Sequence, residues 1–404
     1  MSSQRSAADA EEDGSEELLP SRRSDSIVVT KTAAVQCILL FSGLVVLAAL
    51  AVIVISLLLT NPSLAQRATG SPQTHSPEMD EYDSCITQFT RPQYAYLEDS
   101  YDSPPNNALL IRRARVFTSN KNLEILEEAD ILVENGKISA IGKDLKIERG
   151  REIRQIEALG RVVTPGLVDA HSHLGVWSFP TDLWANFDVN EKTNPAMPQV
   201  RAVDGLNPTD PAIGLIRDGG VTTSQVLPGS SNVMGGEGVQ VKHRVGARTV
   251  KDLVIKGGRR LLKMACGENP KRIFGRDRKE TPISRIGSAW VMRNTLSKAQ
   301  ALKQAQDAFC NTTTAEEKTP PSPPSSLRNL ELQPLVNLLR GSALVHMHCY
   351  TVSDMEMALR VSQEFGYQIT AFHHALEAWM VPDMLARANV SVTTFSDMWG
   401  FKVE

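Results

Sequence analysis

Two histidines one residue apart, His171 and His173, follow a short apolar run at 167–170 that lies between Pro165-Gly166 and Gly175. Residues i and i+2 of a β-strand point to the same face, so both imidazoles could meet at one point where the strand ends. Imidazole is the commonest metal-binding side chain. The pattern therefore predicts a strand that ends in two metal ligands, and the alternative is an exposed or packed pair of histidines.

Three later apolar runs carry further side chains of this kind. Lys263 lies within Leu261–Glu268, two histidines lie within Ala343–Tyr350, and His373-His374 follow Gln368–Phe372. Apolar runs alternating with helical patterns are typical of an α/β fold. Adjacent strand residues face opposite sides, so we expect only one histidine of the 373–374 pair to reach the centre.

The eleven residues at 163–173, Val-Thr-Pro-Gly-Leu-Val-Asp-Ala-His-Ser-His, resemble the first barrel strand of the amidohydrolase superfamily. The resemblance is strongest to its imidazolonepropionase-like and prolidase-like metal-dependent hydrolases. It implies a TIM-type (β/α)8 barrel preceded by half of a small β-sandwich. In such barrels catalytic residues gather at the C-terminal ends of the strands.

The resemblance also implies a ligand set for one or two divalent ions, zinc or a similar metal: His171, His173, Lys263, His348 and His374. Lys263 would bridge two metals after carboxylation by CO2, and burial favours the neutral amine that this reaction needs. Glu268 is the alternative ligand, and a surface lysine on a helix is the structural alternative for Lys263. His346 is the second choice on its strand, and His373 is expected to be structural.

The resemblance further implies an eighth strand ending in an aspartate that takes a proton from the attacking water. The sequence ends at Glu404, after the seventh expected strand, and Asp397 comes too early for that role. We therefore expect an incomplete, C-terminally truncated barrel whose catalytic residue is unknown. A partner that closes it, for example in a homo-oligomer, is the alternative to a fragment.

The segment Thr32–Thr60 contains no charged residue and is long enough to cross a bilayer as a helix. Buried core helices and cleaved signal peptides rarely combine this length, position and apolarity. Arg22, Arg23 and Lys31 precede the segment, and only Arg67 lies close behind it. The distribution predicts a single-pass membrane protein with a cytosolic N-terminus and a luminal or extracellular hydrolase domain.

The predicted organisation has five parts: a disordered cytosolic tail at 1–31, a transmembrane helix at 32–60, a stalk at 61–105, a β-sandwich half at 106–165 and a partial barrel at 166–404 with a flexible insertion at about 311–326. Asn135-Gly136 is a strong hairpin signal in the fourth part. Pairing of the cysteines beyond the span is allowed in an oxidising compartment but not required. The net charge of −3 does not suggest a nucleic-acid partner.

These observations together predict a membrane-anchored, metal-dependent hydrolase of a C–N bond with a small-molecule substrate. The resemblance carries the reaction class, and cyclic amides, imidazolones and dipeptides are the substrates that it suggests. The alternatives are a catalytically inactive amidohydrolase-like membrane protein, a fragment or domain that acts in binding, and a hydrolase for another bond such as an ester.

Overall fold

The structure is a computed structural model that describes residues 77–90, 108–148, 152–180, 185–312, 322–395. The chain divides into two units, Met1–Ser76 and Pro77–Glu404, and the described residues all belong to the second. The predicted tail and membrane span lie outside the described residues. Within the described ranges, every helix is too short or too polar to cross a membrane.

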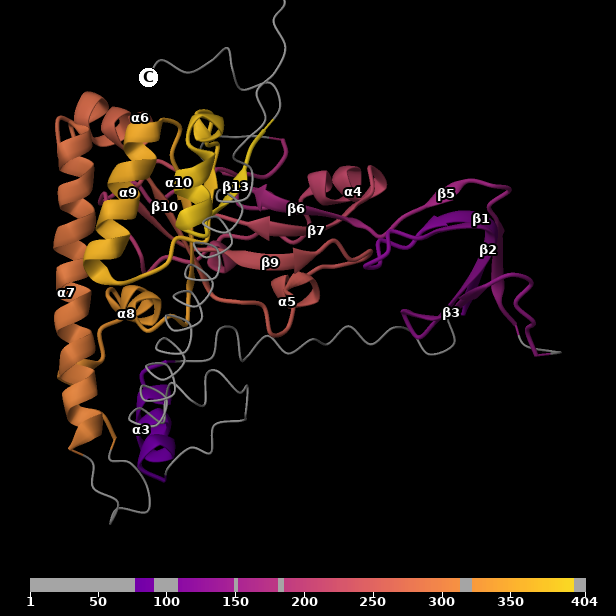
Figure 1. The fold of residues 1–404 in the computed structure, drawn as a ribbon, viewed down its shortest axis with the longest axis horizontal. Coiled ribbons are helices and arrows are strands. Elements are labelled where there is room, and N and C mark those ends of the chain that lie inside the picture. Colours follow the sequence, from indigo (N-terminus) through magenta and orange to yellow (C-terminus); the bar gives the residue numbers. More distant parts are fainter. Residues whose placement is uncertain (1–76, 91–107, 149–151, 181–184, 313–321, 396–404) are drawn as a thin grey trace, which may run out of the picture. The chain divides into compact units, whose positions relative to one another are not determined.

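A five-stranded sheet forms the first part of the described chain (Figure 1). Its strands follow the order β3-β2-β1-β4, and β5 also pairs with β1; the bounds are β1 Leu109–Phe117, β2 Ile125–Glu134, β3 Lys137–Gly142, β4 Arg154–Glu157 and β5 Val162–Val163. Asn135 and Gly136 join β2 to β3 with φ of 51° and 71°, as a type I′ hairpin turn requires. The predicted strands and hairpin are confirmed, and the assignment to half a sandwich stays a prediction.

Two further sheets follow, and their strand order follows the chain. One sheet has the order β6-β7-β9, and the other has the order β13-β12-β11-β10-β8. The bounds are β6 Leu167–Ser172, β7 Val221–Val226, β8 Met234–Glu237, β9 Val239–Lys242, β10 Leu261–Ala265, β11 Leu344–His348, β12 Ala371–His373 and β13 Ser391–Thr393. β6 pairs with β7, and β10 to β13 pair in sequence, all in parallel.

The segment between β7 and β10 departs from the predicted βα alternation. Met234–Glu237 forms β8, which is antiparallel to β10, and β9 is antiparallel to β7. In the described ranges, strands β6 to β13 form two separate hydrogen-bonded sheets and not one closed barrel.

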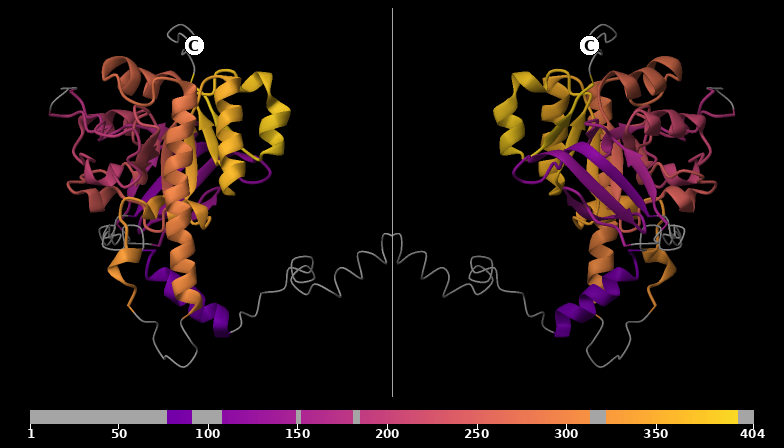
Figure 2. Two further views of the ribbon diagram at one scale, coloured as in Figure 1. Left: turned by 90° about the vertical axis from the view of Figure 1, so that its left-hand side faces the viewer. Right: turned by 90° about the vertical axis from the view of Figure 1, so that its right-hand side faces the viewer.

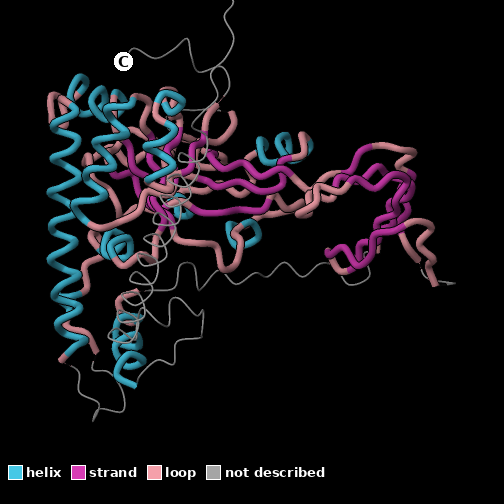
Figure 3. Tube along the Cα trace, in the orientation of Figure 1, coloured by secondary structure: helices cyan, strands magenta, loops and turns pink. Residues whose placement is uncertain are grey.

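Helices connect the strands (Figures 2 and 3), and those at 285–311, 333–339, 352–365 and 382–387 pack on the sheet that contains β10, β11 and β12. The helices are α4 Pro211–Asp218, α5 Val250–Leu253, α6 Glu268–Pro270, a π-helix at Lys271–Asp277, α7 Arg285–Asn311, α8 Gln333–Leu339, α9 Val352–Phe365 and α10 Pro382–Arg387, with short 3-10 turns at Ala202–Asp204, Ser325–Leu327 and Ala378–Met380. Side chains such as Met264, Met347 and Phe372 from the sheet are fully buried with Met292 and Leu335 from the helices. This apolar layer holds β10, β11 and β12 in register.

Part of the predicted stalk is a helix that packs against α7. Helix α3, Pro77–Thr87, is joined to the end of α7 by a disulfide between Cys85 and Cys310, whose Cα atoms are 5.7 Å apart. Tyr82 Oη donates a hydrogen bond of 3.0 Å to Asp307 Oδ1. The segment predicted as a stalk at 61–105 therefore includes a helix, which a covalent link and a hydrogen bond hold against α7.

Candidate metal centre and active site

The C-terminal ends of β6 and β12 bring four imidazoles together. The ring centroid of His171 lies 5.0 Å from that of His173, 4.8 Å from that of His373 and 4.6 Å from that of His374. Two atomic contacts join them: His171 Nδ1 is 2.7 Å from His373 Nδ1, and His171 Nε2 is 3.4 Å from His173 Nε2. Residues about 200 positions apart thus form one cluster, which we call the imidazole cluster.

Backbone carbonyls at the end of β7 orient two of the predicted ligands. His173 Nδ1 lies 2.8 Å from the carbonyl oxygen of Leu227, and Lys263 Nζ donates to the carbonyl oxygen of Pro228 at 3.1 Å. A carbonyl only accepts, so His173 Nδ1 carries the proton and the neutral ring presents a lone pair at Nε2. An N–H held by a backbone carbonyl is the usual support of a metal-binding histidine.

Lys263 lies on β10 and is buried, with 1% of its surface exposed. The alternative of a surface lysine on a helix is therefore wrong. Burial lowers the pKa of Lys263 to about 7. Its partner in the β10–β11 register is His346, and its charge contributes to lowering the pKa values of His171 and His173.

His348 lies two residues after His346, closer to the end of β11. Its ring centroid is 4.7 Å from that of His374 and 4.5 Å from that of Tyr350. Its Nε2 lies 3.4 Å from Asn269 Nδ2, which also donates to Ser230 Oγ at 2.8 Å. The predicted ligands His348 and His374 thus lie side by side, and His374 connects them to His171.

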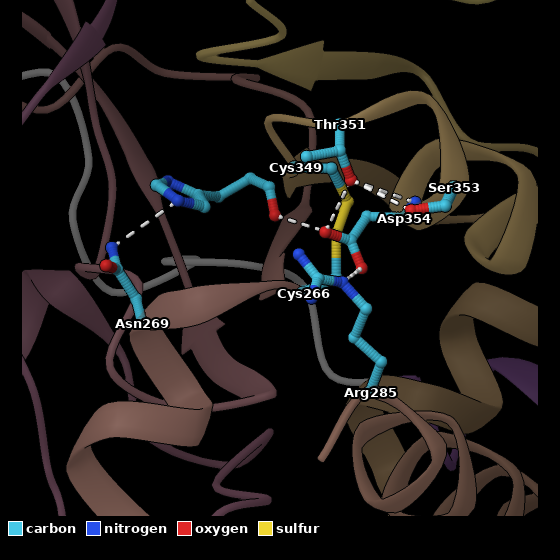
Figure 4. Close-up of a disulfide and its surroundings, with 8 residues drawn as sticks. Cys266, Asn269, Arg285, Cys349, Thr351, Ser353 and Asp354 are labelled. Atoms are coloured by element: carbon cyan, nitrogen blue, oxygen red, sulfur yellow. Dashed lines mark hydrogen bonds and ion pairs between the residues drawn. A yellow bond between two sulfur atoms is a disulfide. The ribbon is translucent and has the colours of Figure 1, made fainter. Parts of the chain in front are cut away.

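A disulfide between Cys266 and Cys349 ties together the ends of β10 and β11, the strands that carry Lys263 and His348 (Figure 4). Both cysteines are fully buried, and their Cα atoms are 5.2 Å apart. Figure 4 also shows Asp354 and Arg285 beside this link, and their ion pair measures 3.0 Å. All four cysteines that follow the predicted membrane span are paired.

The expectation that only one of His373 and His374 reaches the centre is wrong. His373 is the last residue of β12 and faces His171. His374 has a φ of 56°, in the left-handed region, and its ring stacks on Phe395 at a centroid distance of 4.5 Å. The strand alternation ends at His373, and the left-handed turn redirects the next side chain toward the same cluster.

His346 extends the cluster inward. Its Nδ1 lies 2.8 Å from His373 Nε2 and 3.2 Å from Gln225 Nε2. Burial lowers the pKa of His346 to about 4 and that of His373 to about 2, and it lowers the pKa of His171 further still. These rings are therefore neutral near pH 7, which is the form in which histidine binds a metal.

The residues present fit a divalent metal by donor type and by one spacing. Two nitrogen ligands of tetrahedral zinc at about 2.0–2.1 Å lie about 3.3–3.4 Å from each other, and His171 Nε2 and His173 Nε2 are 3.4 Å apart. In the described ranges no three His, Cys, Asp or Glu side chains converge on one point. The contact between His171 and His373 accounts for this, because it turns these rings toward each other.

Two further candidates were named from the sequence. Glu268 begins α6, beyond Gly267, on the turn that follows β10. Asp397 lies outside the described residues. The carbonyls of Leu227 and Pro228, and the side chain of Gln225, were missed by sequence reasoning, because backbone acceptors leave no residue pattern and a lone glutamine carries no signal.

Comparison with known proteins identifies relatives of one superfamily. A solved amidohydrolase from Thermotoga maritima MSB8 is 32% identical, with a TM-score of 0.63, over 73% of this chain and 72% of that one. Amidohydrolase tasK of Hapsidospora irregularis is 38% identical over 294 residues, which are 68% of this chain and 29% of that protein. A dihydroorotase from Geobacter metallireducens is 46% identical over 66 residues, 16% of this chain and 15% of its own. No model of a protein family matches the chain.

The chain thus spans less than a third of the length of the tasK amidohydrolase, and the match to the Thermotoga maritima structure covers most of both chains. On the evidence of fold and sequence together, the chain belongs to the amidohydrolase superfamily.

Proposed function

We propose that this protein is a metal-dependent hydrolase of a C–N bond in a small-molecule substrate. One observation carries the proposal: two neutral imidazoles, of the buried His171 and the partly buried His173, face each other through Nε2 at the spacing of a zinc site, beside the buried Lys263. The relatives named amidohydrolase and dihydroorotase support the reaction class. A cyclic amide or a dipeptide is the substrate type that we infer.

The ligands in this proposal are His171, His173, Lys263, His348 and His374. A divalent ion held there, zinc in the first instance, would supply the Lewis acidity that activates water and polarises a substrate carbonyl. The protein itself orients the ligands and shields them from water. The carbonyls of Leu227 and Pro228 hold the side chains of His173 and Lys263, and burial keeps the imidazoles neutral. The group that takes a proton from water is left unassigned.

Lys263 has a second task in the proposal, the formation of a carbamate. Its buried, uncharged Nζ attacks the carbon of CO2, an N–C bond forms, one C=O π bond becomes the carboxylate, and the amine releases one proton to solvent. The product has two oxygen ligands where the lysine had one nitrogen. The buried position of Lys263 on β10 supports this step, because desolvation disfavours the ammonium form.

The test is metal content and hydrolysis by the full-length protein, purified with zinc and bicarbonate. We expect about one or two metal ions per chain and hydrolysis of at least one member of a panel of cyclic amides, N-acyl amino acids and dipeptides. Lys263→Ala should lose this activity, and added acetate should restore part of it by filling the cavity with carboxylate oxygens. Protein that holds no metal after zinc loading would overturn the proposal.

An inactive relative is the second candidate function. The observation in its favour is that, over the described ranges, no three potential ligands converge on one point. Such a protein would bind metal or small molecules and hydrolyse no member of the panel. Esters are included in the panel to distinguish a C–N hydrolase from a hydrolase that acts on another bond.

We also propose that the intact protein is anchored in a membrane by the segment at 32–60, with residues after it on the luminal or extracellular side. The two buried disulfides support this location, since disulfides persist in oxidising compartments. Asn311-Thr312-Thr313 offers a reporter, because Asn311 is exposed at the end of α7. Removal of a glycan by an endoglycosidase would support the orientation, and digestion of the hydrolase domain by protease from the cytosolic side would overturn it.

A further inference from the structure

Residues 227–233, which we call the β7–β8 connection, join β7 to β8 and lie against two of the proposed ligands. The carbonyl oxygen of Leu227 lies 2.8 Å from His173 Nδ1, and that of Pro228 accepts a hydrogen bond from Lys263 Nζ at 3.1 Å. Both acceptors are backbone atoms, so their positions depend on the path of the chain and not on a side-chain rotamer. The shape of the connection therefore determines how the two ligands are oriented.

The connection reaches a third ligand through one further side chain. Ser230 Oγ, in the middle of the connection, accepts a hydrogen bond from Asn269 Nδ2 at 2.8 Å. The same nitrogen of Asn269 lies 3.4 Å from His348 Nε2. One short segment is thus in contact, directly or through Asn269, with proposed ligands from three separate parts of the chain.

The β7–β8 connection contains no helix or strand that would hold its shape. Among the described hydrogen bonds, none joins two of its residues to each other. Its backbone is bonded to other segments, through the N–H groups of Leu227 and Gly229 and the carbonyl of Val233; their partners are backbone atoms of Ser172, Val189 and Ala265. Contacts with neighbouring segments therefore impose the shape of the connection.

Asn232 is the side chain of the connection with the most described hydrogen bonds, and it is fully buried. Its Nδ2 donates to the carbonyl oxygens of Glu191 at 2.6 Å and Asn194 at 2.8 Å, and its Oδ1 accepts from Asn190 Nδ2 at 3.2 Å. Carbonyl oxygens only accept, so this orientation of the amide is the one that satisfies them, and both of its hydrogens are used. One side chain thus fastens the connection to the loop at 190–194.

We propose that Asn232 is a positioning residue for the metal centre: it holds the β7–β8 connection in the shape that directs two backbone carbonyls toward His173 and Lys263. The inference rests on the proposed function, because metal binding is the use of that orientation. Asn232 has no described hydrogen bond to a proposed ligand, and it acts through the backbone of the connection. Groups that orient metal ligands in this way raise the affinity for the metal.

The chain contains a matched control for Asn232. Asn337, in α8, is also fully buried, and its Oδ1 accepts a hydrogen bond from Gln333 Nε2 at 3.1 Å. It has no described hydrogen bond to the β7–β8 connection. Replacing either asparagine by alanine removes a buried amide of the same size, and only Asn232→Ala releases the connection from the loop at 190–194.

The experiment measures two quantities in full-length wild-type, Asn232→Ala, Asn232→Asp and Asn337→Ala protein. The first is zinc affinity, by competition with a chromophoric chelator. The second is the tautomer of His173 in the metal-free protein, from the 15N shifts of labelled histidines, of which the chain has eight. We expect Asn232→Ala to lose about 10–100-fold in zinc affinity and to populate the Nε2–H form of His173, because the Leu227 carbonyl no longer selects the Nδ1–H form. Asn337→Ala should match wild type in both quantities.

Asn232→Asp separates the hydrogen bonds from the volume of the side chain. Aspartate has the same shape, but it offers at most one hydrogen where the amide donates two. We expect the same changes as in Asn232→Ala, so the test does not depend on the folding of the alanine variant. An unchanged His173 tautomer in the folded Asn232 variants, or an equal loss of zinc affinity in Asn337→Ala, overturns the inference. A wild-type protein that binds no zinc would overturn the proposed function, while the His173 tautomer would still decide the role of Asn232.

Discussion

Two buried polar side chains in different sheets, Asp130 of β2 and Lys263 of β10, differ in how many hydrogen-bond partners they have. Asp130 is 2% exposed and accepts hydrogen bonds from Arg112 Nη1 and from the backbone N–H groups of Arg113 and Leu145, each at 3.0 Å. Lys263 is 1% exposed, and its Nζ has one described partner, the Pro228 carbonyl.

The difference separates a structural polar group from a functional one. A buried charge with a full set of hydrogen-bond partners stabilises its surroundings. A buried amine with one partner lowers the stability of the fold, so a functional role is the expected reason for its position. The partners of Asp130 lie within 18 residues of it in the sequence, whereas the imidazole cluster joins residues that are 202 positions apart. The predictions below test this contrast between the β1–β5 sheet and the cluster.

The largest effect is expected for His171→Ala, at the centre of the imidazole cluster. Loss of a ligand should reduce kcat/KM by about 10³-fold or more, equivalent to about 4 kcal/mol, with loss of bound zinc. His243→Ala is the control, because His243 is also buried and bonded to a carbonyl, that of Val221, at 2.8 Å. It should keep its activity while losing about 1–3 kcal/mol of stability. Equal losses of activity in His171→Ala and His243→Ala would contradict the contrast between the imidazole cluster and buried polar groups elsewhere.

Asp130→Ala should give the opposite result, a loss of stability without a loss of catalysis. It leaves the Arg112 guanidinium and two backbone N–H groups without their acceptor, which costs about 3 kcal/mol in the free energy of unfolding. Activity per folded molecule should match wild type. Glu157→Ala removes an exposed partner of Arg113 and should cost under about 1 kcal/mol. Denaturant unfolding and a kinetic assay of the same preparations measure both quantities.

Lys263→Met should stabilise the metal-free protein while abolishing hydrolysis. Methionine has a similar length and removes the cost of burying a poorly paired amine, so we expect a gain of about 1–3 kcal/mol. The measurement is thermal unfolding in the presence of a chelator, beside the activity of the zinc-loaded protein. A destabilised Lys263→Met protein would show that Lys263 is structural in the way that Asp130 is.

The smallest effect concerns pH and the contact between α3 and α7. Burial raises the pKa of Asp307, but hydrogen bonds from Lys303, Arg340 and Tyr82 outweigh it, and the net shift is downward. The contact is therefore fully present above the unfolded-state pKa of the carboxyl and is lost as the pH falls through its lower folded-state pKa. Asp307→Asn should remove about 1 kcal/mol of stability that in wild type is lost at acid pH, below the unfolded-state pKa of the carboxyl, and it should leave activity unchanged. An unaltered pH profile of unfolding in this variant would contradict the assignment.

Local patterns were read correctly from the sequence wherever neighbouring residues decide the structure. The Asn135-Gly136 turn and the strand that carries His171 near its end both depend on contacts within a few residues. The reversed β8, the docking of α3 and the inward turn of His374 were missed. Each depends on a partner far away in sequence: β10 for the first, Cys310 for the second and Phe395 for the third.

The sequence by itself determined the family, the strands that end in histidine and the candidate ligands, because motif and strand period are properties of consecutive residues. The tertiary structure alone decided which ring nitrogens meet, that Lys263 is buried, and that the carbonyls of Leu227 and Pro228 orient two of the ligands. The physical reason is that hydrogen-bond direction and burial belong to groups brought together from several strands. The sequence specifies which hydrogen bonds each group can donate or accept, and only the fold specifies the partner of each bond.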